Sequence, residues 1–223
     1  MHKLSVVGLA ILLGLFVVTN VAAQGTMIGG KAGFNVSDLS VDEAPGEVID
    51  MRTDFVGGGF VSFPIGESFA IQPEVLYARK GAKIDDFDED AELEAKLDYI
   101  EIPVLLVARL TDQNSAARPI VYAGPAVSFE VNCELEGTVE AVSASADCDR
   151  LSEVGADENI ETKGTDFGLV FGGGVEFDAG SAVIIIEGRY NVGLVDINDA
   201  TEDDEIKNRA FSFMAGIGFP IGP

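Results

Sequence analysis

Acidic side chains crowd one stretch of the sequence and offer the first candidate for chemistry. Residues 84–95 contain seven Asp or Glu residues and no basic one. The spacing Asp86-x-Asp88-x-Asp90 is the way an EF-hand calcium loop begins. Ala91 stands where that loop needs its turn glycine, however, and Leu97 where it needs a bidentate glutamate. We therefore expect at most weak binding of divalent cations by the acidic loops.

Histidine, the commonest acid-base residue of enzymes, occurs once, as His2. The expected mature chain therefore has no Ser-His-Asp triad and no histidine-ligated metal. The glycine runs 57–59 and 172–174 are not phosphate loops, because each lies inside an expected strand with no helix after it. The sequence predicts no catalytic residue, no metal site and no cofactor, so we expect that the protein is not an enzyme.

A second set of charged residues alternates with apolar ones. In residues 181–195, Ile184 and Ile186 fall on one face of an extended chain, and Glu187 and Arg189 on the other. Charges on a poorly hydrated face persist only when they are paired. We predict a structural ion-pair network in the interior of a barrel, made of Lys31, Glu74, Glu101, Glu176, Glu187, Arg189 and Arg209.

The elements that would position these residues are strands, because alternation of period two recurs and helical periodicity is absent after residue 24. Eight segments of about ten residues or more carry the alternation. They are residues 26–37, 53–63, 68–80, 96–109, 119–131, 164–178, 181–195 and 208–219.

The connections between these segments alternate between long, acidic loops and short turns. Residues 64–67 and 179–180 are tight turns, and residues 110–118 form a medium link. In an up-and-down meander, successive connections lie at opposite ends, so the long loops share one end. This is the plan of an eight-stranded antiparallel transmembrane β-barrel.

The composition of the two faces favours the membrane orientation. The polar face is mostly Gly, Ser, Val and Ala with one or two charges per strand, which is too few for a surface in water. Phe55 and Phe63 cap the apolar face of one segment at both ends, as aromatic girdles do in membrane barrels. The alternatives are a narrow channel and a soluble, lipocalin-like periplasmic barrel that binds an apolar ligand.

The N-terminus indicates export. Residues 1–23 have a positive start, an apolar stretch over 4–18 and small residues at 21–23, the pattern of a cleaved signal peptide. A membrane anchor is the alternative, but the stretch is short for a span. We expect one domain over 24–223. Cys133 and Cys148 suggest one disulfide in an exported chain.

The charge balance limits the partners. A formal net charge of −24 argues against nucleic acid and anionic phospholipid. We expect outer-membrane lipid and the barrel-insertion machinery as partners, and no protein partner can be named from the sequence.

Five motifs in order carry a family resemblance. They are Gly30-Lys31-Ala32-Gly33-Phe34-Asn35, the segment 72–81, Asp98-Tyr99-Ile100-Glu101-Ile102-Pro103, Tyr122-Ala123-Gly124-Pro125 and the segment 187–194. Together they resemble the PorT-type outer-membrane β-barrel family of Bacteroidetes, distantly similar to the OmpA and OmpX type. The resemblance implies a small barrel in the cell outer membrane. We expect a structural or interaction role, with acidic extracellular loops and a plugged lumen.

Overall fold

The computed structural model describes the chain as strands and the short connections between them. The described residues are 25–40, 52–84, 91–111, 115–139, 142–147, 164–194 and 207–221. The expected signal peptide 1–23, the motif Asp86 to Asp90 and Cys148 lie outside them. The strands are β1 (Thr26–Ser40), β2 (Arg52–Ile65), β3 (Phe69–Ile84), β4 (Ala91–Arg109), β5 (Ala117–Val139), β6 (Val142–Asp147), β7 (Thr165–Asp178), β8 (Val183–Gly193) and β9 (Lys207–Ile221).

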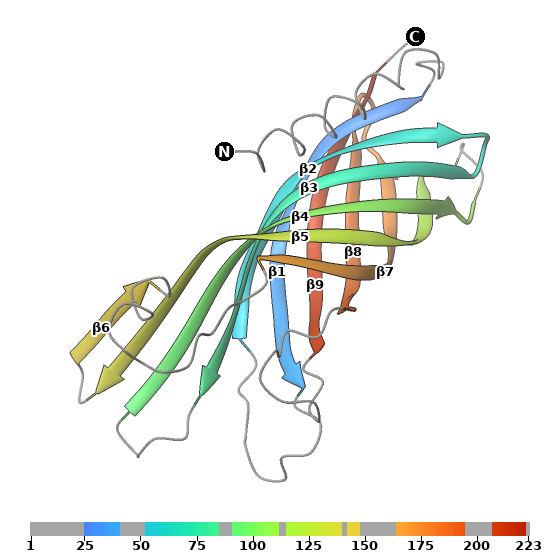
Figure 1. Ribbon diagram of the computed structural model, residues 1–223. Coiled ribbons are helices and arrows are strands. Elements are labelled where there is room, and N and C mark those ends of the chain that lie inside the picture. The colour runs from blue at the N-terminus through green and yellow to red at the C-terminus, as the bar shows by residue number, and fades with distance from the viewer. Residues whose placement is uncertain are drawn as a thin grey trace, which may run out of the picture.

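Eight of these strands close into an antiparallel barrel (Figure 1). Neighbours in the chain pair with each other, and β1 pairs with β9 from Thr26↔Ile221 to Ser40↔Lys207. The pairing of β4 with β5 and of β5 with β7 completes the ring. The predicted eight-stranded up-and-down barrel is confirmed. β6 is an additional strand that pairs with β5, outside the ring.

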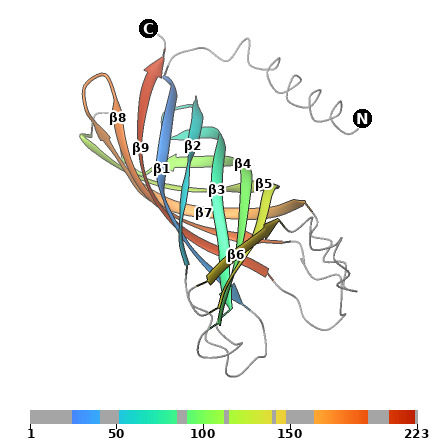
Figure 2. The ribbon, with the colours of Figure 1, turned by 90° about the vertical axis from the view of Figure 1, so that its left-hand side faces the viewer.

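The two ends of the barrel differ. At one end, here called the turn end, β2 joins β3 through residues 66–68 and β7 joins β8 through 179–182. Gly66 and Gly180 have φ of 73° and 76° there, a left-handed conformation that glycine adopts without steric cost. The opposite end is called the loop end. β3, β4, β5 and β6 extend past the rest of the barrel on that side (Figure 1 and Figure 2).

The sequence-based boundaries are wrong at the loop end, because β3, β4 and β5 extend further there than the expected segments 68–80, 96–109 and 119–131. Residues 91–95 were expected in a loop but belong to β4, where Leu93 pairs with Gly137 of β5. β6 was not expected at all. The segment 91–97 does alternate, with Leu93 and Leu97 between charged residues. Its charge density is typical of a loop, and no lipid-facing apolar pattern marks it as a strand.

Two prolines coincide with interruptions in the pairing between strands. The β3–β4 pairing stops at Pro73↔Val104 and resumes at Leu76↔Glu101. The β4–β5 pairing likewise stops at Pro103↔Ala126 and resumes three residues on. A proline weakens strand pairing locally because it has no N–H to donate to the neighbouring strand.

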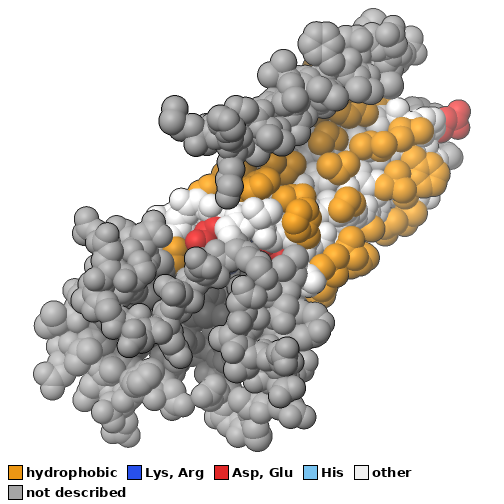
Figure 3. All heavy atoms as spheres, viewed as in Figure 1, with side chains coloured by type: hydrophobic (Ala, Val, Ile, Leu, Met, Phe, Trp, Pro, Cys, Tyr) orange, Lys and Arg blue, Asp and Glu red, His pale blue; other side chains and the backbone are white. Residues whose placement is uncertain are grey.

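Apolar side chains face outward and charged ones inward. On β8, Ile186 is 56% exposed, whereas the adjacent Glu187 is 3% exposed. Figure 3 shows the apolar side chains gathered side by side over the outer surface of the described strands. Water would not favour such a surface, but lipid does. The arrangement is that of a membrane barrel and contradicts the soluble, lipocalin-like alternative. No helix in the described ranges is long and apolar enough to cross a membrane.

Candidate functional site

Four charged side chains meet at the middle of the lumen and form the central cluster: Lys31 of β1, Glu74 of β3, and Glu187 and Arg189 of β8. Lys31 Nζ lies 2.8 Å from Glu74 Oε1 and 2.9 Å from Glu187 Oε1. Arg189 Nη1 lies 2.9 Å from Glu74 Oε2, and its Nη2 also pairs with Glu187. The cluster has no net charge, and its side chains are at most 1% exposed.

Aromatic rings and an amide hold the central cluster in place. Gln72 donates a hydrogen bond of 2.8 Å to Glu74. Lys31 Nζ lies 5.0 Å from the centre of the Phe60 ring, and the Arg189 guanidinium lies 5.5 Å from that of Tyr122. Cation–π contacts of this kind strengthen when water is excluded. The two cations are therefore stabilised by both carboxylates and aromatic faces.

Below the central cluster, toward the turn end, the lumen is filled by apolar side chains. This set is called the apolar layer. Leu105 is fully buried, and Phe60, Ile120 and Ile185 are 3–5% exposed. Its members belong to one cluster of buried residues that includes Met27, Phe60, Ala70, Leu105, Val107, Ile120, Val183 and Ile185. The interior of the barrel is thus packed as a core at this level.

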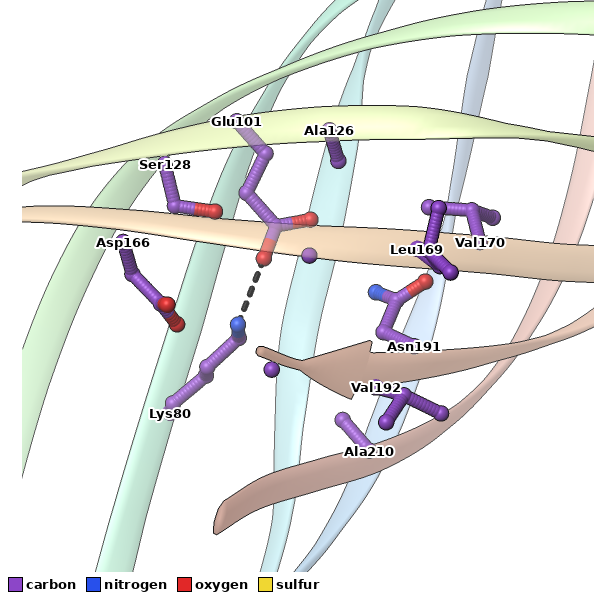
Figure 4. Close-up of a pocket in the computed structure, with 12 residues that line it drawn as sticks. Lys80, Glu101, Ala126, Ser128, Asp166, Leu169, Val170, Asn191, Val192 and Ala210 are labelled. Carbon is purple, nitrogen blue, oxygen red and sulfur yellow. Dashed lines mark ion pairs between the residues drawn. The ribbon is translucent and has the colours of Figure 1, made fainter. Parts of the chain in front are cut away.

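Toward the loop end lies a small pocket beside a second ion pair. Lys80 Nζ is 2.6 Å from Glu101 Oε1, and Lys80 lies 5.1 Å from the centre of the Tyr99 ring. Figure 4 shows Lys80 reaching toward Glu101, with Asp166 on the same side of the pocket and Asn191 on the other. The pocket volume is about 20 Å³, which is room for about one water molecule.

A third group of charges lines the lumen at the turn end and is called the ladder: Arg109, Glu176, Arg118 and Asp178. Arg109 donates to both oxygens of Glu176 at 2.9 and 3.0 Å. Arg118 donates to Glu176 at 3.3 Å and to both oxygens of Asp178 at 3.0 and 3.1 Å. Cations and carboxylates therefore alternate along one wall.

The ladder faces a cavity of about 510 Å³ that opens at the turn end. The end of β2 and the β2–β3 turn also contribute to the lining, with Ser62, Pro64, Gly66 and Glu67. Ser62 is 2% exposed, and its hydroxyl has no hydrogen-bond partner among the described residues.

The structure brings four of the predicted lumen residues together and places two others elsewhere. Lys31, Glu74, Glu187 and Arg189 form the central cluster, whereas Glu101 pairs with Lys80 and Glu176 joins the ladder. The side chain of Arg209 lies outside the described residues, so its place in the lumen stays a prediction.

Sequence reasoning missed three cations of the lumen, namely Lys80, Arg109 and Arg118. Strand parity could have found two of them. Lys80 is six residues after Glu74 on β3, and Arg109 is eight after Glu101 on β4, so each shares the inward side of its strand. Both positions lie at the end of an expected segment, where charges are typical of loops.

The chemistry available to these groups is electrostatic. Each of the four predicted lumen carboxylates, on Glu74, Glu101, Glu176 and Glu187, pairs with a cation. Among the described residues, no group of three or more His, Cys, Asp or Glu side chains is placed to hold a metal ion.

The predicted Cys133–Cys148 disulfide is not tested by the structure. Cys133 lies on β5 beyond the barrel ring and is not a free thiol, whereas Cys148 is outside the described residues. The pairing stays a prediction.

Comparison with known proteins agrees with the geometry. A family described as "Outer membrane protein beta-barrel domain" matches residues 22–199. Among solved structures, OprG from Pseudomonas aeruginosa is similar with a TM-score of 0.51 and 13% identity, over 90% of this chain and 98% of OprG. That likeness shows the fold alone. No curated protein sequence matches the chain significantly.

Two further solved structures are similar at lower scores. Neisserial surface protein A has a TM-score of 0.47 and 15% identity, over 88% of this chain and 97% of its own. Ail of Yersinia pestis, solved in complex with sucrose octasulfate, has a TM-score of 0.47 and 12% identity, over 87% of this chain and 99% of its own.

Proposed function

The chain belongs to the family of outer-membrane protein β-barrel domains, and from this premise we propose that it is a non-enzymatic membrane anchor with a closed lumen. In such barrels the short turns face the periplasm and the long loops face the medium. The turn end is then periplasmic, and the loop end presents the acidic loops outside the cell. The proposed role is structural or one of interaction through those loops.

The observation that carries this proposal is the double closure of the lumen. An ion crossing it would have to displace the central cluster, whose charges are almost completely buried. It would next have to lose its hydration shell in the apolar layer, where Leu105 is 0% exposed. Hydrophobic constrictions of this kind block ions because they exclude water. An ion would meet these two barriers one after the other, which supports the proposal that the lumen is closed to ions.

A narrow channel is the second candidate, and planar-bilayer recording separates the two. The full mature chain, reconstituted at low protein density, should leave the membrane at its baseline conductance. Insertion is checked separately by the mobility of the unboiled protein in SDS. Steady single-channel steps from inserted protein would contradict the closed lumen and favour the channel.

Three finer statements belong to the same proposal. We propose that residues 1–23 are a cleaved signal peptide, that Cys133 and Cys148 form one disulfide, and that the chain is of the PorT type. The N-terminal sequence of protein isolated from membranes tests the cleavage, which should leave Gln24 first. Intact mass before and after reduction and alkylation tests the disulfide.

Weak binding of divalent cations by the acidic loops is also proposed, from the spacing of Asp86, Asp88 and Asp90. Because the glycine and the final glutamate of an EF-hand are missing, the dissociation constant should be about 1 mM or weaker. Calcium titration of the variant with all three residues changed to Asn, against wild type, measures the contribution of this motif.

A further inference from the structure

The strands that leave the barrel at the loop end continue as a four-stranded sheet, here called the loop-end sheet. Its strand order is β3–β4–β5–β6. The pairing of β3 with β2 ends at Val56↔Ala78, whereas β3 pairs with β4 as far as Ile84. On the other side, β6 pairs with the end of β5. The loop-end sheet therefore has two edges that the barrel ring does not close.

The edge on β6 is open among the described residues. β6 is the last strand of the sheet and pairs with β5, and no other described strand pairs with its second edge. Figure 1 shows β6 at the outer margin of the projecting strands, away from the ring. In an antiparallel sheet, alternate residues of an edge strand direct their N–H and C=O groups away from the paired neighbour. Such a row of backbone groups is a template for one more strand.

The sequence of β6 contains none of the features that commonly protect an edge strand, which are lysine, proline and a bulge. β6 is Val-Ser-Ala-Ser-Ala-Asp, and its register with β5 is regular over all six residues. The free segment of β3, in contrast, carries Lys83. Where β3 leaves β2, the Asn35 side chain donates a hydrogen bond to the carbonyl oxygen of Arg79. Of the two edges, the one on β6 is therefore the better template.

The charge beside this edge selects the partner. Within β4, β5 and β6, the loop-end sheet comprises residues 91–98, 130–139 and 142–147, which include seven acidic residues and a single basic one, Lys96. A strand that approaches β6 meets this excess of negative charge, which attracts a basic segment. A second copy of the chain is disfavoured, because its own formal net charge is −24.

We propose that β6 binds an extended, basic peptide segment of another protein as an additional strand of the loop-end sheet. In this mode of recognition, hydrogen bonds between main chains supply the affinity. The acidic residues of the sheet then favour lysine or arginine in the incoming segment. This proposal rests on the proposed role of the loop end in interaction, and it names the class of partner that the role would use.

The test is a fluorescence anisotropy titration of the full mature chain in zwitterionic detergent micelles. The probe is a labelled decapeptide of alternating threonine and lysine. A decapeptide of alternating proline and lysine has the same charge but lacks half of the N–H donors, and one of alternating threonine and glutamate reverses the charge. The Thr-Lys peptide should bind at least about tenfold more tightly than either control peptide. On binding, hydrogen exchange should slow at alternate amides of β6.

Two variants of β6 separate main-chain from side-chain recognition. Ser143→Pro combined with Ala144→Pro removes two neighbouring N–H groups and should weaken binding of the Thr-Lys peptide by about tenfold or more. Ser143→Ala combined with Ala144→Ser changes the same side chains but keeps both N–H groups, so this protein should bind as the wild type does. β6 lies outside the ring, so both proteins should keep the SDS mobility of a folded barrel.

Several results would overturn the proposal. One is no binding of the Thr-Lys peptide, and another is equal binding of the Pro-Lys or the Thr-Glu peptide. Slow exchange of the β6 amides in the free monomer would show that the chain itself covers this edge. Protection that rises with protein concentration in the absence of peptide would assign the edge to a second copy. Channel activity in bilayers would contradict the closed lumen without bearing on this titration.

Discussion

At the scale of single residues, the lumen balances the cost of burying charge against pairing. Lys31 and Arg189 each contact both carboxylates of the central cluster, so that every charge in it has two opposite partners. Taking an ion out of water costs several kcal/mol, and pairing recovers this cost only with good geometry. The presence of the cluster therefore says little about net stability, whereas removal of one partner would leave a buried charge without full compensation.

The dependence on pairing predicts the effect of Glu187→Gln. Loss of the Glu187 carboxylate leaves two cations, Lys31 and Arg189, facing the single carboxylate of Glu74. We therefore expect the free energy of unfolding to fall by about 3–5 kcal/mol. Asp178→Asn is the matched control, because its carboxylate is also paired with an arginine but is 45% exposed. It should cost at most about 1 kcal/mol. Urea titration in detergent measures both, and equal losses would contradict the prediction.

At the scale of strands, period-two alternation predicted the barrel because lipid enforces it along every strand. Ile184, Ile186 and Tyr190 of β8 face outward as expected, with Glu187 and Arg189 inside. The band of outward-facing apolar side chains around the barrel is called the apolar belt. Where β4 and β5 continue past this belt, lipid no longer requires apolar residues on the outer face. That is why residues 91–95 and β6 were not recognised.

The candidate site was predictable only in part. The alternation of inward and outward positions along each strand places Lys31, Glu74, Glu187 and Arg189 in the lumen. Which of these side chains meet depends on the register between the strands. Lys31 and Glu187 are 156 residues apart and belong to strands that are not neighbours in the barrel. The cavity at the turn end could not be predicted, because it depends on how far Arg109 and Arg118 reach toward Glu176.

The membrane orientation of the strands predicts a depth-dependent cost for an outward charge. Leu106 of β4 is 53% exposed in the apolar belt, and Leu110 is 61% exposed at its turn-end margin. Leu106→Arg should lower the free energy of unfolding in lipid by about 2–4 kcal/mol, and Leu110→Arg by about 1 kcal/mol or less. In a soluble barrel, neither change would cost more than the other. Equal and small effects in vesicles would therefore count against the assignment.

Close packing of strand backbones predicts different tolerance at adjacent glycines. A Cβ at Gly58 would lie 2.0 Å from the carbonyl oxygen of Val75 on β3, whereas a Cβ at Gly59 would come no closer than 3.6 Å to the Gly29 oxygen. Gly58→Ala should cost about 1–3 kcal/mol through strain. Gly59→Ala should be neutral or stabilising by up to about 1 kcal/mol. Equal changes of the unfolding midpoint in the two variants would contradict this prediction.

At the scale of the whole molecule, closure of the sheet matters more than any single contact. In lipid an unpaired backbone group costs several kcal/mol, so a membrane sheet cannot keep an open edge. The pairing of β1 with β9 removes the last edge over fifteen consecutive residue pairs. The described strands thus form a closed ring whose outer face is apolar.

Closure predicts that the folded barrel resists SDS until it is heated. The electrophoretic mobility of an unboiled sample should therefore differ from that of a boiled one. SDS does not readily unfold a closed barrel, because the barrel has no unpaired edge strand. Ala215→Pro tests the pairing of β1 with β9. Ala215 pairs with Ala32 in the middle of β9, and proline removes a backbone hydrogen bond between strands there. It should lower the temperature at which the folded band disappears. Ile221→Pro, at the last residue of β9, should change that temperature much less. A wild-type protein with the same mobility before and after boiling would contradict the closed ring, because only an open sheet would unfold in cold SDS.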